Sequence, residues 1–151
     1  MSVIKKQFAV TRNYLANTLE GISPEILDVI PEGFNNNIRW QVGHILATAE
    51  FFLFKGQETI PANYFSLFAT GSKPADWNEE IPSLETLLEK INTQLVRIND
   101  LSDEVFNQEL PEPIFHTKTV GELAAIAAFH EAMHLGQIQS MKRLLESVKV
   151  N

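Results

Sequence analysis

Apolar residues recur at helical spacing along most of the chain. In residues 3–20 and again in 84–98 they fall three and four residues apart, which places them on one face of an α-helix. The second of these segments also carries charged and polar residues on its opposite face, as an amphipathic helix with one solvent-exposed side does. We therefore expect a helix in each segment, with Gly21 ending the first and Ser83 capping the second.

Two further helices are expected in the middle and at the end of the chain. Between residues 38 and 55 apolar side chains lie on most sides of the predicted helix, so it is either the centre of a bundle or also contacts a second subunit. Thr119 and Glu122 form a capping box, and the last helix then runs to about Val148. These four main helices predict an all-α fold, a four-helix bundle in a single domain over residues 1–151.

Longer connections follow the second and third main helices. Residues 56–82 combine prolines and glycines with several aromatic residues, which is unusual for a connection of this length. Two interpretations stay open: this connection is a lid or binding loop, or its aromatic residues cover one end of the bundle. Residues 100–110 predict a short helical turn, and Pro111 and Pro113 then keep the chain extended.

Composition and charge narrow the classes of function. The net charge of −7, without a basic cluster, argues against general binding to a nucleic-acid backbone. The absence of cysteine excludes disulfides, thiolate catalysis and sulfur-ligated metals. The longest apolar run, residues 51–54, is too short to cross a bilayer, and the first residues lack the apolar core of a signal peptide. We expect a cytoplasmic protein with no membrane or nucleic-acid partner.

His130 and His134 carry the strongest chemical signal. They lie four residues apart on the last helix, at positions where a bundle helix normally places Leu or Ile on its core face. Residues at this spacing lie one above the other, so two imidazoles can reach one metal ion. Burying two polar rings without partners costs free energy, and we interpret the pair as metal ligands rather than as a hydrogen-bonded structural pair.

The stretch from His130 to His134 also has the H-E-x-x-H pattern of zinc proteases. That interpretation needs a third ligand downstream, and no histidine follows His134. Glu146 is three helical turns further on, about 18 Å by helical rise, and cannot reach the same ion. Glu131 points roughly 100° away from the ligand face. The pattern is therefore not interpreted as a protease site.

A third ligand has to come from upstream, where His44 and His116 remain. His116 lies in the proline-rich extended segment and is expected at the surface. His44 lies in the middle of an apolar helix, where a facing helix can bring it to the pair. Three neutral imidazoles suit zinc, nickel, iron or copper, and they leave at least one coordination position open, as in catalytic sites.

These residues resemble those of a known family. The segments Trp40–Ile45 (W-Q-V-G-H-I) and His130–Gln137 (H-E-A-M-H-L-G-Q) are similar to those of DinB-like (DinB/YfiT) proteins, and the likeness covers nearly the whole chain. The resemblance implies a four-helix bundle, usually a homodimer, that binds a divalent metal, nickel or zinc, through His44, His130 and His134. It also implies relatives that are S-transferases or isomerases using low-molecular-weight thiols.

Three functions stay open on this basis. The first is metal-dependent transfer of a low-molecular-weight thiol, the cosubstrate, to a small electrophilic molecule. The second is metal-dependent hydrolysis of a small molecule, and the third is a non-catalytic, metal-stabilised dimeric binding protein whose residues 51–54 contact the partner. A pocket that reaches the metal from solvent favours the first two, and no pocket beside the metal favours the third.

Supporting roles are assigned only by position, and no catalytic side chain is identified. We expect Phe51 or the 56–82 connection to form the wall of a pocket. We expect Gln41 or Gln137 to orient a ligand without itself binding the metal. The physiological substrate is not defined by the sequence, because pockets are built from variable loops.

Overall fold

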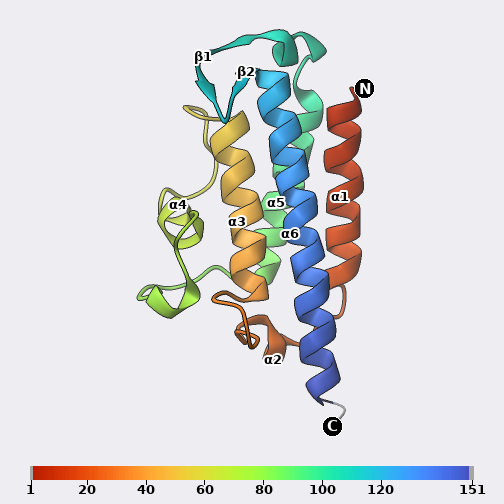
Figure 1. Cartoon of the computed structure of the whole chain (residues 1–151), viewed down its shortest axis with the longest axis vertical. Helices are drawn as coiled ribbons and strands as arrows, with labels where there is room; N and C mark the ends of the chain where they lie inside the picture. The colour runs from red at the N-terminus through yellow and green to blue at the C-terminus, as the bar shows by residue number, and fades with distance from the viewer. Residues whose placement is uncertain (1, 150–151) are drawn as a thin grey trace.

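Four long helices, α1 (Val3–Leu19), α3 (Ile38–Leu53), α5 (Leu84–Asp100) and α6 (Val120–Lys149), lie side by side along the length of the molecule (Figure 1). The computed structural model describes residues 2–149. The shorter elements are α2 (Pro24–Leu27), α4 (Asn63–Phe68), two 3-10 helices, η1 (Pro74–Asp76) and η2 (Asp103–Asn107), and the strands β1 (Glu109–Ile114) and β2 (Thr117–Thr119). The predicted all-α four-helix architecture is confirmed. No helix within residues 2–149 has the length and apolarity needed to cross a membrane.

The helix boundaries follow from local capping chemistry. The Asn37 side chain accepts a hydrogen bond from the Trp40 amide at the start of α3. Thr119 and Glu122 form the predicted capping box at the start of α6: the Glu122 amide donates to Thr119 Oγ1 at 3.1 Å, and the Thr119 amide donates to the Glu122 carboxylate at 3.3 Å. Because each cap satisfies amides that the helix itself leaves free, these helices begin at fixed residues.

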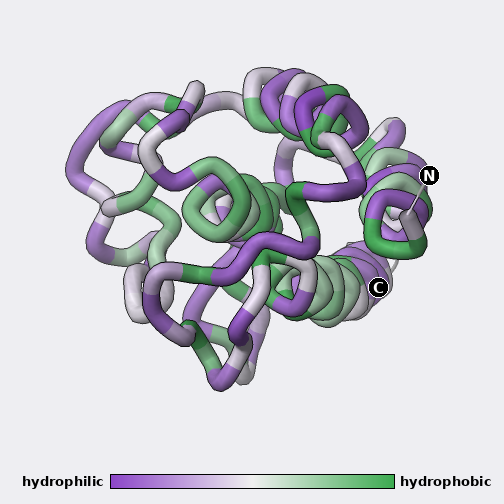
Figure 2. The backbone as a smooth tube through the Cα atoms, turned by 90° about the horizontal axis from the view of Figure 1, so that it is seen from above, coloured by the Kyte–Doolittle hydropathy of each residue, from purple (hydrophilic) through white to green (hydrophobic). Residues whose placement is uncertain are grey.

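Helix α3 is the central element, as its apolar character predicted. It contacts α4, α5 and α6, and most of its residues from Ile38 to Glu50 are buried. Seen along the bundle, the chain between α3 and α5 covers the side of α3 that faces away from α1 (Figure 2). A helix enclosed in this way can hold a polar side chain out of water only if the surrounding elements supply its partners.

The 56–82 connection is folded onto α3 rather than being an open loop. It contains α4 and η1, neither of which was expected from the sequence pattern. Phe68, at the end of α4, is fully buried, and its ring lies directly on the backbone of Gly43. A Cβ atom at position 43 would lie 2.4 Å from that ring, so only glycine permits this approach. The aromatic residues of the connection therefore cover the side of α3 and not one end of the bundle.

A buried ion pair joins α1 to α6. Arg12 donates from Nε and from a terminal nitrogen to the two carboxylate oxygens of Glu131, at 3.2 and 2.6 Å, and both side chains are almost fully buried. Arg12 also donates to the Ile91 carbonyl and to the Gln94 side chain on α5. Burial of an ion pair is weak evidence of stability. Separation of the two partners, however, would leave a buried charge without compensation. The pair therefore fixes how α6 is rotated relative to α1.

The same polar network continues from α5 to α3. The amide nitrogen of Gln94 donates to the buried carboxylate of Glu50. Glu50 also accepts from the Thr59 amide and from Arg97, both at 2.7 Å. The network thus ties all four long helices and the start of the 56–82 connection to one another, which restricts their relative rotation.

The segment after α5 forms a β-hairpin whose turn is strained. The extended chain predicted around Pro111 and Pro113 is present as β1, which pairs with β2. The two turn residues, Phe115 and His116, have φ angles of +50° and +63°. A two-residue turn with positive φ at both positions normally carries Asn-Gly, and for other residues this conformation costs roughly 1–2 kcal/mol each. His116 is exposed there, as expected.

Substitution of Gly43 by alanine should disturb the packing of α4 on α3. The added methyl group would force the Phe68 ring to move, and overpacking of this kind costs about 1–3 kcal/mol, more than the gain of up to about 1 kcal/mol from helix propensity. We expect Gly43→Ala to lower the free energy of unfolding measured in urea. Gly136→Ala is the control. Gly136 lies in α6 with open space around it, so this substitution should raise the free energy of unfolding by up to about 1 kcal/mol. Equal effects of the two substitutions would contradict this account.

Candidate metal centre

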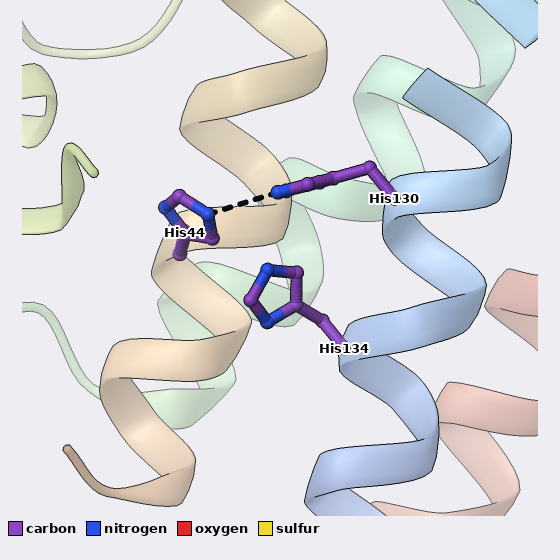
Figure 3. A group of neighbouring side chains, drawn as sticks. All are labelled: His44, His130 and His134. Atoms are coloured by element: carbon purple, nitrogen blue, oxygen red, sulfur yellow. Dashed lines mark hydrogen bonds between the residues drawn. The ribbon is translucent and has the colours of Figure 1, made fainter. Parts of the chain in front are cut away.

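Three imidazole rings meet between α3 and α6 (Figure 3). His44 comes from α3, and His130 and His134 come from successive turns of α6. One ring nitrogen of each lies within 4.8 Å of the others, and Nε2 of His44 is 3.0 Å from Nε2 of His130. His44 and His134 are buried, and His130 is partly buried. The structure thus brings together the three histidines that were expected to be metal ligands.

The tautomer of His44 is set by α4. Its Nδ1–H donates to the backbone carbonyl of Phe68 at 2.6 Å, and because a carbonyl can only accept, Nε2 carries the lone pair. The indole of Trp40 stacks on the His44 ring, with ring centroids 4.6 Å apart and an interplanar angle of 11°. Hydrogen bonding of one ring nitrogen so that the other faces inward is how proteins orient metal-binding histidines.

His134 is oriented by Gln41. Its Nδ1–H donates to the side-chain oxygen of Gln41. The amide nitrogen of Gln41 in turn donates to Asn36 at 2.9 Å and to Gln137 at 2.8 Å, which leaves the amide oxygen to accept from the histidine. Gln41 is therefore in direct contact with a candidate ligand, and Gln137 acts through Gln41.

His130 is held less completely than the other two histidines. Its Nδ1 is buried and has no hydrogen-bond partner within residues 2–149. Since Nε2 of His44 carries a lone pair, the 3.0 Å contact requires Nε2–H of His130 to be the donor when no ion is present. His130 is thus the one member of the group whose Nδ1 is not oriented by an acceptor.

Comparison with known protein families identifies the family of this chain. The family model of the DinB superfamily matches residues 7–138. The chain belongs to the DinB superfamily. No curated protein matches the chain. The match includes the whole of α3 and all three histidines of α3 and α6.

Burial keeps the imidazoles of this DinB-superfamily chain uncharged at neutral pH. Desolvation lowers the pKa of His44 below its ordinary value of 6.5. Desolvation, with a smaller contribution from the neighbouring rings, lowers the pKa of His130 to about 4 and that of His134 to about 3. A neutral imidazole is the form that binds a metal ion, so the donor set fits a divalent ion without first losing protons.

Glu131 lies outside the candidate metal centre, although it separates the two histidines in sequence. Its carboxylate is held by Arg12 of α1, whose guanidinium also donates to Ile91 and Gln94 of α5. Burial raises the pKa of Glu131, and the Arg12 guanidinium opposes that shift. A carboxylate held there cannot act on a ligand bound between α3 and α6. This position agrees with rejection of the protease interpretation.

A cavity of about 540 Å³ lies next to the histidines. Ala47 and Thr48, one turn after His44, form part of its lining, and so does Phe68, whose carbonyl accepts from His44. Phe51 and residues of the 56–82 connection also line it, in agreement with the expected pocket wall. None of the three histidines is among its lining residues. The cavity therefore adjoins the candidate metal centre without opening directly onto it.

The lowered pKa values predict how the stability of the metal-free protein depends on pH. As the pH falls below about 6.5, the histidines of the unfolded chain take up protons before those of the folded chain do. The free energy of unfolding should therefore decrease from about pH 6.5 to about pH 4, where His130 also begins to protonate in the folded state. Urea unfolding across this range measures the slope.

The control for this slope is the double variant His130→Leu/His134→Leu, which removes two of the shifted groups. Its free energy of unfolding should depend less steeply on pH than that of the wild type, whatever its stability at pH 7. Equal slopes would show that these imidazoles do not account for the loss of stability in acid.

Proposed function

We propose that this chain binds one divalent ion, nickel or zinc, through His44, His130 and His134. The observation that carries the proposal is the convergence of three uncharged imidazoles, two of which direct Nδ1–H outward to fixed acceptors. Two lone pairs so directed match the donors that zinc and nickel take from proteins, and three protein ligands leave room for a substrate. Membership of the DinB superfamily is compatible with such a site.

We further propose that the bound ion serves the transfer of a low-molecular-weight thiol to a small electrophilic molecule. The ion, when bound, supplies Lewis acidity that lowers the pKa of a thiol. The chain has no cysteine, so the sulfur nucleophile belongs to the cosubstrate. The sulfur forms a bond to the electrophilic carbon, the leaving group departs with the bonding electrons, and the thiol proton passes to solvent.

The residues around the histidines hold the ligands rather than take part in the chemistry. Phe68 and Gln41 fix the orientation of His44 and His134, and Trp40 covers one face of His44. These contacts keep the rings in place before substrate arrives, which lowers the cost of reorganisation. Hydrolysis of a small molecule would use the same arrangement, with water in place of the thiol.

A non-catalytic, metal-stabilised binding protein is the alternative of a different class. It is favoured by one observation: none of the histidines lines the adjacent cavity. The homodimer and the cytoplasmic location expected from the sequence stay predictions.

The proposal is tested on purified protein loaded with nickel or zinc. Metal content should be about one ion per chain in the wild type and should fall in His44→Ala, His130→Ala and His134→Ala. His116→Ala is the matched control. This exposed histidine lies on the hairpin turn, away from the three proposed ligands, so the variant protein should keep its metal. Unchanged metal content in the three site variants would show that the ion binds elsewhere.

The reaction is tested in the same preparations with monochlorobimane as electrophile and several low-molecular-weight thiols. We expect turnover that requires both the metal and a thiol and that is lost in the three site variants. Stoichiometric metal binding with no metal-dependent turnover for any thiol would contradict the transferase and leave the non-catalytic alternative.

A further inference from the structure

Half of the residues that line the cavity beside the candidate metal centre are phenylalanines, and they come from three separate parts of the chain. Helix α3, the 56–82 connection and the β-hairpin meet around it. We call it the aromatic pocket, after its five phenylalanines: Phe51, Phe52, Phe65, Phe68 and Phe115. Its volume of about 540 Å³ is within the range of small-molecule sites, which are mostly apolar with few polar groups.

The charge of the aromatic pocket limits what can bind there. Glu58 is its one charged lining residue, and the other polar groups are the hydroxyls of Thr48 and Thr70. The Gly56 amide donates to the Glu58 carboxylate at 2.8 Å and so holds it in place at the exposed rim. Lys55 lies over the Phe51 ring, 5.5 Å from its centroid, but is not part of the lining. The aromatic pocket therefore offers no cation to an anionic ligand, and an unpaired anion there would lose hydration without compensation.

Phe115 provides an independent observation. It occupies a turn position with φ of +50°, which is strained for a bulky residue, and its side chain is 66% exposed. Burial of this side chain in the core therefore does not offset the strain. Its ring instead contacts Phe52 at the rim of the pocket, with centroids 5.7 Å apart and an interplanar angle of 67°. Strained residues of this kind concentrate at binding and catalytic sites.

We propose that the aromatic pocket binds an uncharged or cationic small molecule through an aromatic or branched apolar group, and that Phe115 is the residue that closes over it. Binding here needs no metal. If the proposed transferase function holds, the same pocket accepts the apolar part of the electrophile, because its Phe68 wall also orients His44.

The charge preference is tested with a matched pair of fluorescent probes on metal-free protein. N-phenyl-1-naphthylamine is uncharged, and 8-anilino-1-naphthalenesulfonate is the same ring system with a sulfonate. We expect the uncharged probe to bind at least about tenfold more tightly. Glu58→Gln should narrow this ratio by about twofold to fivefold, because the carboxylate repels the sulfonate across solvent. Equal or tighter binding of the sulfonate to the wild type would overturn the proposal.

The location is tested with two tryptophan substitutions. Thr48→Trp fills the aromatic pocket and should abolish binding of the uncharged probe. Ala132→Trp is the control: it fills a second apolar groove, between α1 and α6, that Val10 and Phe129 also line. Loss of binding in Ala132→Trp with retention in Thr48→Trp would place the probe in that groove and overturn the proposal.

The role of Phe115 is tested by Phe115→Asn/His116→Gly, which gives the turn the residues that its backbone favours. Relief of strain should raise the midpoint of thermal unfolding by roughly 2–8 °C, whereas loss of the ring should weaken binding of the uncharged probe by about threefold to tenfold. A purely structural Phe115 would give the higher stability with unchanged affinity, which would contradict its assignment to the pocket.

Two further outcomes separate this proposal from the others. Because the probes are used on metal-free protein and on His130→Ala, a failure of metal binding leaves the result for the aromatic pocket unaffected. Sedimentation velocity is run in parallel. If wild type is a dimer that excludes the probe and Thr48→Trp is a monomer, a second copy of the chain covers the pocket, and the proposal is wrong.

Discussion

The cost of keeping three imidazole rings out of water between α3 and α6 governs much of the surrounding structure. A buried ring nitrogen needs a partner, and two of the rings obtain one for Nδ1: His44 from the backbone of α4, and His134 from Gln41 of α3. The carbonyl of Phe68 reaches His44 because Gly43 has no side chain to keep α4 away. Gln41 reaches His134 because Asn36 and Gln137 occupy its amide nitrogen. The inward-facing nitrogens are thereby left as lone pairs, uncharged at neutral pH.

Helix α6 has polar groups buried on two of its sides, and this arrangement explains why an H-E-x-x-H string here does not form a protease site. His130 and His134 face α3, while Glu131 is held by Arg12 of α1. Rotation of α6 would separate Glu131 from Arg12 and leave a buried charge unpaired. The Arg12–Glu131 pair thus fixes the rotation of α6, and that rotation directs the two histidines toward His44.

The features that depend on local periodicity could be predicted from the sequence, and those that depend on distant or unusual contacts could not. Helical spacing revealed the long helices, and the placement of polar rings on an apolar face revealed the three histidines. No local pattern marks Arg12 as buried, since its partner Glu131 lies 119 residues away. Phe68 orients His44 through its backbone carbonyl. Every residue has such a carbonyl, so the sequence could not indicate this contact. The hairpin turn at Phe115 and His116 lacks the Asn-Gly pattern by which such turns are recognised.

The central claim, that one ion is bound by all three histidines, is tested most directly by X-ray absorption spectroscopy of the protein loaded with zinc or nickel. The account predicts three imidazole ligands per ion, with metal–nitrogen distances of about 2.0–2.1 Å for zinc, plus at least one oxygen or nitrogen from solvent. It also predicts that any ion retained by His44→Ala is coordinated by only two imidazoles. A spectrum with fewer than three imidazoles in the wild type, or one that does not change in His44→Ala, would contradict the claim.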